Sequence, residues 1–139
     1  MLIVNPIARR RITAAVTLSY LTCTIGPAVA ADGWFTQAQA TRGHQLFNNN
    51  CAECHRPDLT GAQGPALIGP AFLQKWGNKP LSDLYTFEHT MMPATNPGSV
   101  PQEQLWAITA YILQKNGFAA GDSDLGDAAS GKTLAINGH

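Results

Sequence analysis

The clearest helical periodicity lies near the end of the chain, between residues 102 and 116. Its apolar stripe consists of Leu105, Ile108, Thr109 and Ile112, widened by Trp106, Ala110 and Leu113. Ser99 and Gln102 have the spacing of a capping box, and Pro101 stands at the predicted first turn. Gly117 is a typical stop signal. The pattern therefore predicts a helix from about residue 102 to residue 116.

Two further segments have the same periodicity, at about 36–49 and 81–90. Thr36 with Gln39 forms a second candidate capping box. The face that this first helix would bury contains Ala40, Gly43 and Phe47, and the face of the other helix contains Leu84, Tyr85 and Phe87. A glycine inside a helix costs about 1 kcal/mol relative to alanine. We therefore expect Gly43 to mark a close contact with another helix.

The segments between these helices are rich in proline and glycine, at 57–80 and 91–100. This composition predicts loops, with at most short helical turns in the first of them. No segment shows the alternation of a strand. The sequence thus predicts an all-α domain with three main helices over residues 31–118. The Gly, Ala, Asp and Ser content of 119–139 predicts a flexible tail.

The first thirty residues have the pattern of a secretory signal peptide. Three arginines at 9–11 precede a short apolar run, and Ala28-Val29-Ala30 is a small-x-small cleavage site. The alternatives are a membrane anchor, lipidation at Cys23 and a twin-arginine signal. The run is short for a membrane span, and no small residue directly precedes Cys23. We therefore expect cleavage before Ala31, a periplasmic location and no membrane anchor afterwards.

Cleavage would change both the charge and the cysteine count of the chain. The full sequence has nine basic and nine acidic residues, and removal of three arginines leaves a net charge of −3. This mild acidity argues against a nucleic acid or an anionic membrane as a partner. Of the three cysteines only Cys51 and Cys54 would remain. Both belong to the most specific motif in the chain.

That motif is Cys51-Ala52-Glu53-Cys54-His55, which has the C-x-x-C-H pattern of covalent haem attachment. Each thiol can form a thioether to a haem vinyl group, and the adjacent histidine is placed to bind the iron. A shuffled chain of this composition would contain roughly 0.002 such matches. The alternatives are a thioredoxin-like dithiol and half of a zinc site. A dithiol usually lies in an α/β setting, and zinc needs a second pair of ligands.

The second iron ligand is a choice between methionine and histidine. Met92 follows a predicted helix, and Pro93 favours an extended backbone at Met92 that holds the thioether away from that helix. Met91 is the neighbouring alternative, and His89 would give bis-histidine ligation. Most methionines only fill cores. The sequence favours His55 and Met92 as the metal ligands.

Several short motifs of the chain resemble bacterial class I cytochromes c. They are Phe47 to His55, Gly64-Pro65-Ala66-Leu67, Met92-Pro93, Pro97-Gly98 and Ala110-Tyr111-Ile112-Leu113. They are similar to those of cytochromes that serve periplasmic quinoprotein dehydrogenases or sulfur oxidation. The resemblance implies a cytochrome c-like fold around a single haem c, with Gly43 and Phe47 facing Tyr111 or Trp106.

The resemblance also implies roles for four further residues. The carbonyl of Pro65 would accept a hydrogen bond from His55, and Leu67 and Phe72 would wall the haem. Trp76 would reach a haem propionate. Together with Cys51, Cys54, His55 and Met92, these residues form the expected cofactor site.

Ligation by His and Met fills both axial positions, which suits single-electron transfer rather than substrate chemistry. The expected function is a periplasmic electron carrier, not an enzyme, between a dehydrogenase and a terminal acceptor such as an oxidase or another cytochrome. The alternatives are a tightly bound subunit of a dehydrogenase complex and a five-coordinate haem sensor or peroxidase-like enzyme.

Overall fold

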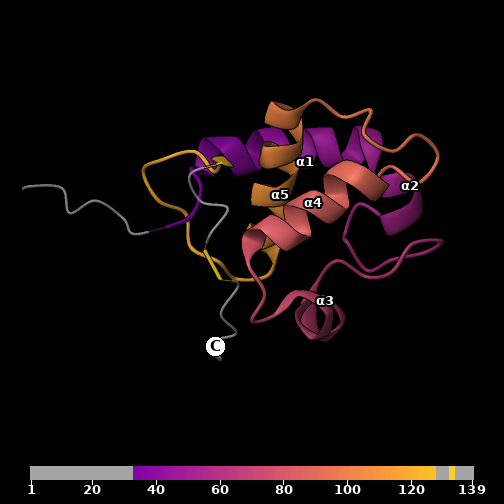
Figure 1. Cartoon of the computed structure of the whole chain (residues 1–139), viewed down its shortest axis with the longest axis horizontal. Helices are drawn as coiled ribbons and strands as arrows, with labels where there is room; N and C mark the ends of the chain where they lie inside the picture. Colours follow the sequence, from indigo (N-terminus) through magenta and orange to yellow (C-terminus); the bar gives the residue numbers. More distant parts are fainter. Residues whose placement is uncertain (1–32, 128–131, 134–139) are drawn as a thin grey trace, which may run out of the picture.

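The structure is a computed structural model that describes residues 33–127 and 132–133. The described chain forms five helices, shown in Figure 1: α1 (Gln37–Asn50), α2 (Ala52–His55), α3 (Gly69–Trp76), α4 (Leu81–Met91) and α5 (Gln102–Lys115). Within these residues the only β-type pairing consists of two isolated bridges. The all-α prediction is confirmed. The predicted signal peptide lies outside the described residues.

Helices α1 and α5 make the most extensive contact between elements and cross at Gly43. A Cβ atom on Gly43 would lie 1.8 Å from the carbonyl oxygen of Ala107, so only glycine lets the two backbones approach this closely. The Phe47 and Tyr111 rings pack beside the crossing with centroids 5.5 Å apart. The expected helix contact at Gly43 is confirmed, with Tyr111 as the aromatic partner.

Helix α5 runs through the centre of the core. All seven residues of its predicted stripe are buried, and Thr109 is among them. Trp106 stacks on Tyr85 of α4, with ring centroids 3.7 Å apart. Because α5 is covered by α1 on one side and by α4 on another, it fixes where these two helices lie. None of the helices among the described residues combines the length and apolar character needed to cross a bilayer.

The two predicted capping boxes have different outcomes. The Thr36 hydroxyl caps α1 by accepting a hydrogen bond from the backbone N–H of Gln39 at 3.0 Å, as predicted. The Gln39 side chain does not complete the box, because it bonds to residue 125 instead. The prediction that Ser99 caps the last helix was wrong. Helix α5 has Pro101 as its N-cap and no side-chain cap, since Ser99 takes part in the preceding turn.

Helix α3 is the main element that the sequence reading did not anticipate. Its eight residues lie inside the segment 57–80, where only short helical turns were expected. Pro70 lies in the first turn of α3, where a missing N–H removes no helical hydrogen bond. The proline and glycine of this segment therefore mark the start of a helix as well as the loops around it.

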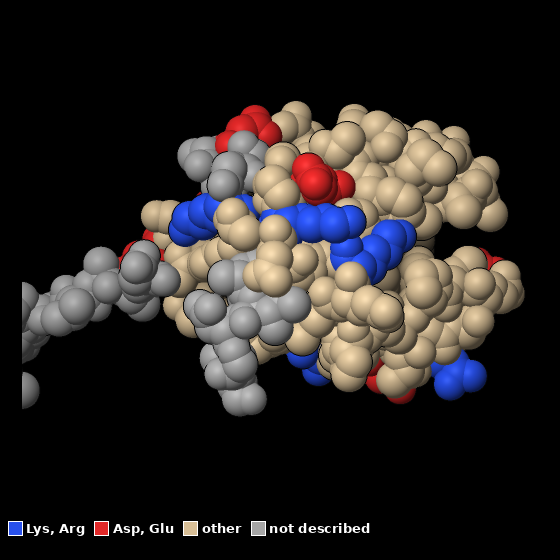
Figure 2. Space-filling model, turned by 60° about the horizontal axis from the view of Figure 1, so that its bottom comes forward, with Lys and Arg blue, Asp and Glu red and all other residues tan. Residues whose placement is uncertain are grey.

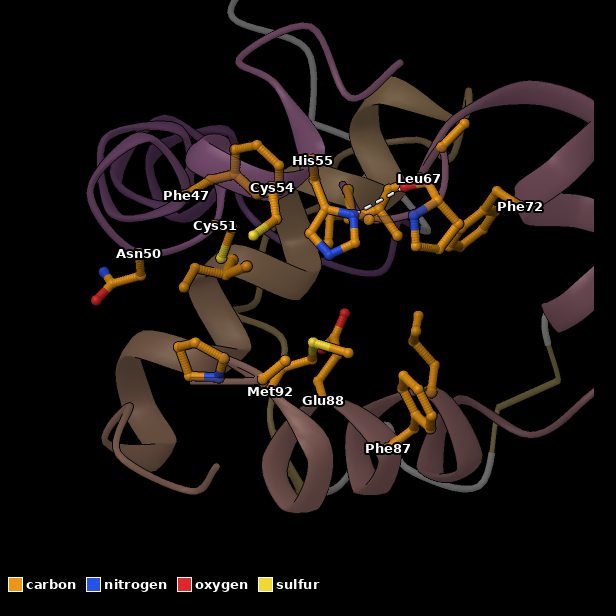
Figure 3. Close-up of a pocket in the computed structure, with 18 of the residues that line it drawn as sticks. Phe47, Asn50, Cys51, Cys54, His55, Leu67, Phe72, Phe87, Glu88 and Met92 are labelled. Atoms are coloured by element: carbon orange, nitrogen blue, oxygen red, sulfur yellow. Dashed lines mark hydrogen bonds between the residues drawn. The ribbon is translucent and has the colours of Figure 1, made fainter. Parts of the chain in front are cut away.

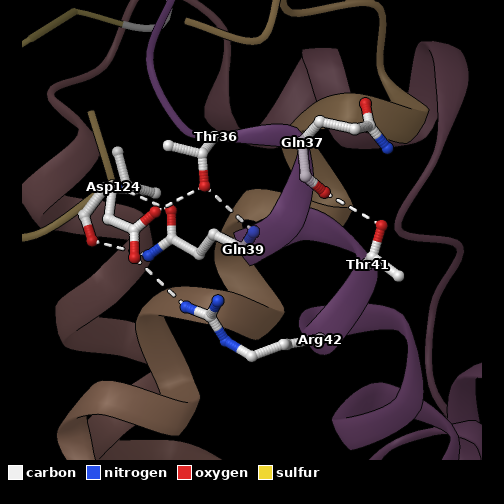
Figure 4. Close-up of polar contacts among 7 residues, drawn as sticks. Thr36, Gln37, Gln39, Thr41, Arg42 and Asp124 are labelled. Carbon is white, nitrogen blue, oxygen red and sulfur yellow. Dashed lines mark hydrogen bonds and ion pairs between the residues drawn. The ribbon is translucent and has the colours of Figure 1, made fainter. Parts of the chain in front are cut away.

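Residues 119–127, the first part of the segment predicted to be a flexible tail, make defined contacts with α1. Gln39 donates to the carbonyl of Leu125 at 2.8 Å and accepts from its N–H at 2.6 Å, and Leu125 is buried. Asp124 accepts from Thr36 and pairs with Arg42 at 3.1 Å (Figure 4). A buried leucine and a side chain that pairs with its backbone give this segment a defined position. Residues 128–131 and 134–139 lie outside the described part.

Candidate haem site

A largely apolar cavity of about 580 Å³ opens between α2, α3, α4 and α5. This volume lies within the usual range for cofactor pockets, about 300–1,000 Å³. All eight residues predicted for the site line it: Cys51, Cys54, His55, Pro65, Leu67, Phe72, Trp76 and Met92. Figure 3 shows the His55 ring and the Met92 side chain facing one another across the cavity.

His55 is held by a loop that turns back beneath it. The backbone N–H of Gly61 donates to the His55 carbonyl at 3.0 Å, and that of Gly64 donates to the Cys54 carbonyl at 3.0 Å. A Cβ atom on Gly64 would lie 2.5 Å from Cε1 of His55. Glycine is therefore the only residue that lets the loop lie flat against the imidazole.

The same loop fixes the tautomer of His55. Nδ1 lies 2.8 Å from the Pro65 carbonyl oxygen, which is the contact expected from the sequence. A carbonyl can only accept, so Nδ1 carries the proton and Nε2 keeps its electron pair for a metal. His55 is itself 7 % exposed, so little water competes for Nε2. The ring is thus oriented and made a better donor by its second contact.

Met92 is held at the end of α4. Its backbone is extended, with φ −122° and ψ 153°, as predicted for a residue before proline. Its N–H donates to the carbonyl of Glu88 at 3.1 Å, and its carbonyl accepts from Gly98 at 3.2 Å. The two bonds place the thioether in the cavity, where Figure 3 shows it.

The two alternatives for the second ligand lie elsewhere. Met91 is 52 % exposed and does not line the cavity. His89 is exposed and stacks on Tyr85, with ring centroids 6.0 Å apart. Neither side chain faces His55, so the geometry favours Met92.

The two cysteines lie half-buried on the cavity rim and are not bonded to each other. Burial raises the pKa of the Cys51 thiol to about 12, with smaller contributions from the charges of Glu88 and Cys54. A reactive dithiol needs a lowered pKa, so this site does not suit redox exchange. Among the described residues no three His, Cys, Asp or Glu side chains gather as a metal site, which removes support for structural zinc.

Glu88 is a buried carboxyl in the cavity that the sequence reading missed. Its Oε2 accepts a hydrogen bond from the Thr109 hydroxyl at 2.5 Å, and its Oε1 has no partner among the described residues. Burial raises the pKa of Glu88 to about 8, against a smaller lowering by the Thr109 bond. Glu88 follows Leu81 and Leu84 at helical spacing, and that shared face was the available signal.

The wall of the cavity is tied to α5 by Asn116. The Asn116 amide donates to the Leu67 carbonyl at 2.9 Å, and its oxygen accepts from the N–H of Gly69 at 2.9 Å. Phe72 and Trp76 follow on the buried face of α3. Asn116 therefore places the apolar wall relative to the helix that forms the core.

This set of residues fits a covalently bound haem. Two half-buried thiols, an imidazole with its other nitrogen engaged and a thioether on the opposite side surround a cavity that has an apolar wall. Oε1 of Glu88, which has no partner among the described residues, also faces this cavity. A haem bound there would supply an iron that takes up and releases one electron at a time.

Part of the chain is similar to known cytochrome proteins. Residues 38–112 match the family model described as cytochrome c oxidase, cbb3-type, subunit III. The cbb3-type cytochrome c oxidase subunit CcoP of Azospirillum sp. (strain B510) is 32 % identical over 108 residues. That match covers 66 % of this chain and 35 % of the relative, so the chain spans about a third of its length.

A solved structure gives the same result for the fold. The sulfane dehydrogenase SoxCD from Paracoccus pantotrophus superimposes with a TM-score of 0.52 and 29 % identity, covering 60 % of this chain and 46 % of that one. The predicted cytochrome c-like fold is confirmed by this likeness. The chain belongs to the cytochrome c family represented by cbb3-type oxidase subunit III, whose domains bind haem c and transfer electrons.

Proposed function

We propose that the chain is a periplasmic single-electron carrier with one haem c, attached through Cys51 and Cys54 and ligated by His55 and Met92. It passes electrons between a dehydrogenase and a terminal acceptor. The observation that supports this most strongly is the placement of His55 and Met92 on opposite sides of one apolar cavity. A haem iron held by these two residues would have no position left for a substrate.

The residues of the chain would favour fast transfer by staying in place. The Pro65 carbonyl holds the His55 ring, and hydrogen bonds at both its N–H and its carbonyl hold the Met92 backbone. Ligands fixed in this way reorganise little when an electron arrives. A thioether ligand also raises the reduction potential relative to a second histidine.

The ligand assignment is tested with two methionine variants. We expect the oxidised protein to show the charge-transfer band between methionine sulfur and ferric iron. Met92→Ala should abolish this band, while the matched control Met91→Ala should keep it because Met91 is exposed on the surface. A wild type without the band would contradict the proposal, and a band that survives in Met92→Ala would exclude Met92.

The five-coordinate alternative has a separate test. Reduced wild type should bind carbon monoxide poorly, because the ligand must first displace Met92, and Met92→Ala should bind it readily. Fast binding by the wild type would favour a sensor or enzyme. The described residues of the cavity include two carboxyls, Glu53 and Glu88, and His55 as the only histidine.

A second candidate function is a firmly held subunit of a larger complex. It is favoured by the relatives themselves, since CcoP is named as an oxidase subunit and SoxCD as a dehydrogenase. Purification of the tagged chain from periplasmic extract separates the two functions. A stoichiometric partner that persists through gel filtration would identify a subunit, and a monomer would identify a free carrier. Mass spectrometry of the same sample tests cleavage before Ala31.

A further inference from the structure

Three lysines form a line along one side of α3 and its neighbours. Nζ of Lys75 lies 3.9 Å from the Phe87 ring centroid, and Nζ of Lys79 lies 5.6 Å from that of Trp76. Nζ of Lys132 lies 5.4 Å from the Trp34 ring centroid. All three lysines are exposed. Figure 2 shows basic side chains in a line across one face of the molecule, with acidic side chains beside it.

The chain itself brings the three lysines together. Lys75 precedes Trp76 in the sequence and Lys79 follows it. The Nζ atoms of both lysines lie near the Trp76 ring, 4.9 and 5.6 Å from its centroid. The Lys132 carbonyl accepts from the N–H of Leu81 at 2.7 Å, only two residues after Lys79. We call Lys75, Lys79 and Lys132 the lysine line.

The lysine line has no ion-pair partner among the side chains that the structure describes. The only ion pair between described side chains joins Arg42 and Asp124, so no carboxylate of the described residues lies within ion-pair distance of these lysines. The ammonium groups rest on aromatic faces instead, which limits their movement but leaves their charge unpaired. The chain after residue 30 has six basic residues against nine acidic ones, so the line holds half of its positive charge.

The lysine line also begins at the haem site. Lys75 and Trp76 both line the cavity, and the buried ring of Trp76 packs on Phe87, another lining residue, with centroids 5.3 Å apart. A protein bound over this face would therefore lie against the wall of the cavity. The position connects the charge on the surface with the electron-transfer site.

We propose that the lysine line is the docking surface for the acidic face of a redox protein, an inference that rests on the proposed electron-transfer function. The residues after position 30 carry a net charge of −3, so a local positive line among them orients the molecule with its cavity wall toward the partner. Such steering speeds association and fades with salt. The contact would be brief, as suits a carrier that must release its partner.

The test measures oxidation of the ferrous holoprotein by small complexes of opposite charge. Hexacyanoferrate(III) is a trianion and stands in for an acidic face, and tris(phenanthroline)cobalt(III) is a trication. Reversing all three charges, with Lys75→Glu, Lys79→Glu and Lys132→Glu, should slow oxidation by the anion about tenfold at low salt and speed oxidation by the cation. Both effects should disappear at high salt.

Matched single variants separate a local field from net charge. Lys79→Glu and Lys115→Glu change the total charge equally, and Lys115 lines a different groove with His44 and Asp58. We expect Lys79→Glu to have a clearly larger effect than Lys115→Glu. Equal effects on the oxidation rate would overturn the proposal, because the rate would then depend on net charge and not on the position of the lysine line. The methionine charge-transfer band, recorded on the same samples, reports separately on the proposed function.

A protein probe completes the test. Poly-L-glutamate, added to the isotope-labelled ferrous protein, should shift the amide signals of residues 75–79 and 132 in a salt-sensitive way. Shifts confined to residues around Cys51 and Cys54 would place the acidic contact at the motif and contradict the proposal. The triple variant should lose the shifts at α3.

Discussion

The two sides of the cavity are built in different ways. We call residues 51–67 the His55 wall. The contacts that hold His55 all come from within this segment, through the carbonyls of Cys54, His55 and Pro65. The Met92 wall (the last turn of α4 and residues 93–98) is backed by α5, through the bond from Thr109 to Glu88.

The difference explains what the sequence could disclose. The contacts of the His55 wall lie within one short segment, so they appear in the sequence as a compact motif, C-x-x-C-H followed by a glycine-rich loop. The contact behind the Met92 wall joins two helices, so its residues, Glu88 and Thr109, lie far apart in the sequence and form no motif. The Met92 wall also contains the only buried acidic residue of the described core. The two walls should therefore respond differently to pH and to substitution.

The largest expected effect is a pH dependence at the Met92 wall. The pKa of Glu88 is raised by burial from an ordinary value of 4.5 to about 8. Below pH 4.5 the Glu88 carboxyl is neutral in both states and its full contribution to the free energy of unfolding is present. As pH rises from 4.5 to about 8 this free energy falls, because Glu88 ionises in the unfolded chain while it stays neutral in the folded one. At about 1.4 kcal/mol per pKa unit, the loss is at most roughly 4–5 kcal/mol.

Urea unfolding of the ferrous holoprotein across this range measures that loss. Glu88→Gln keeps the shape of the side chain and removes its ionisation, so its stability should change much less between pH 4.5 and pH 8. Parallel curves for wild type and Glu88→Gln would contradict the pKa argument. His55-wall variants should keep the slope of the wild type.

The next effect belongs to the His55 wall. Gly64→Ala should destabilise the protein by about 3 kcal/mol, because the added Cβ would lie 2.5 Å from the imidazole and force the loop away. Gly126→Ala is the matched control, since nothing lies within 4 Å of its Cβ position. Urea midpoints and the haem spectrum measure the result. Equal midpoints for both variants would show that the loop does not constrain His55.

A smaller effect is expected at the bond behind the Met92 wall. Thr109→Val removes the hydroxyl that bonds to Oε2 of Glu88 and leaves a buried carboxyl without a donor. The cost is about 2 kcal/mol. Thr41→Val is the control, because the Thr41 hydroxyl bonds only to the carbonyl of Gln37 at an exposed site. In the background of Glu88→Leu the penalty should shrink, and an unchanged penalty would argue against coupling.

The smallest effect concerns the join between the His55 wall and α5. Asn116→Ala removes the bonds to Leu67 and Gly69 and should cost about 1 kcal/mol. Asn50→Ala removes only an exposed bond to the carbonyl of Leu46 and should have less effect. Amide hydrogen exchange at 67–69 should speed up in Asn116→Ala alone. Unchanged exchange there would mean that the loop is held by its own contacts.

The sequence predicted most of the helical frame because the frame depends on local patterns. The stripe on α5, the cap at Thr36 and the close approach at Gly43 all follow from periodicity and backbone rules. The eight predicted site residues line one cavity for a similar reason. Their motifs are short, and the helices that position them are strongly periodic.

The parts that were missed depend on contacts between distant residues. Glu88 is buried where α4 packs on α5, and its partner Thr109 lies twenty-one positions later in the chain. Helix α3 begins with glycine and proline and has eight residues, so its periodicity covers barely two turns. The residues around Leu125 resemble a tail in composition, and side chains near the start of α1, among them Gln39 and Arg42, hold them in place.

One pair of contacts at the ends of the domain has a consequence for larger proteins. Trp34 donates its N–H to Ala119 at 3.1 Å, and Gly121 donates to Phe35 at 2.7 Å. The segments that flank the helical core, before α1 and after α5, therefore lie side by side, and the described chain then continues to residue 127. A unit with adjacent entry and exit points can be joined to other domains, or inserted between them, without unravelling its interior. Such a unit is well suited to recur as one domain of longer electron-transfer proteins.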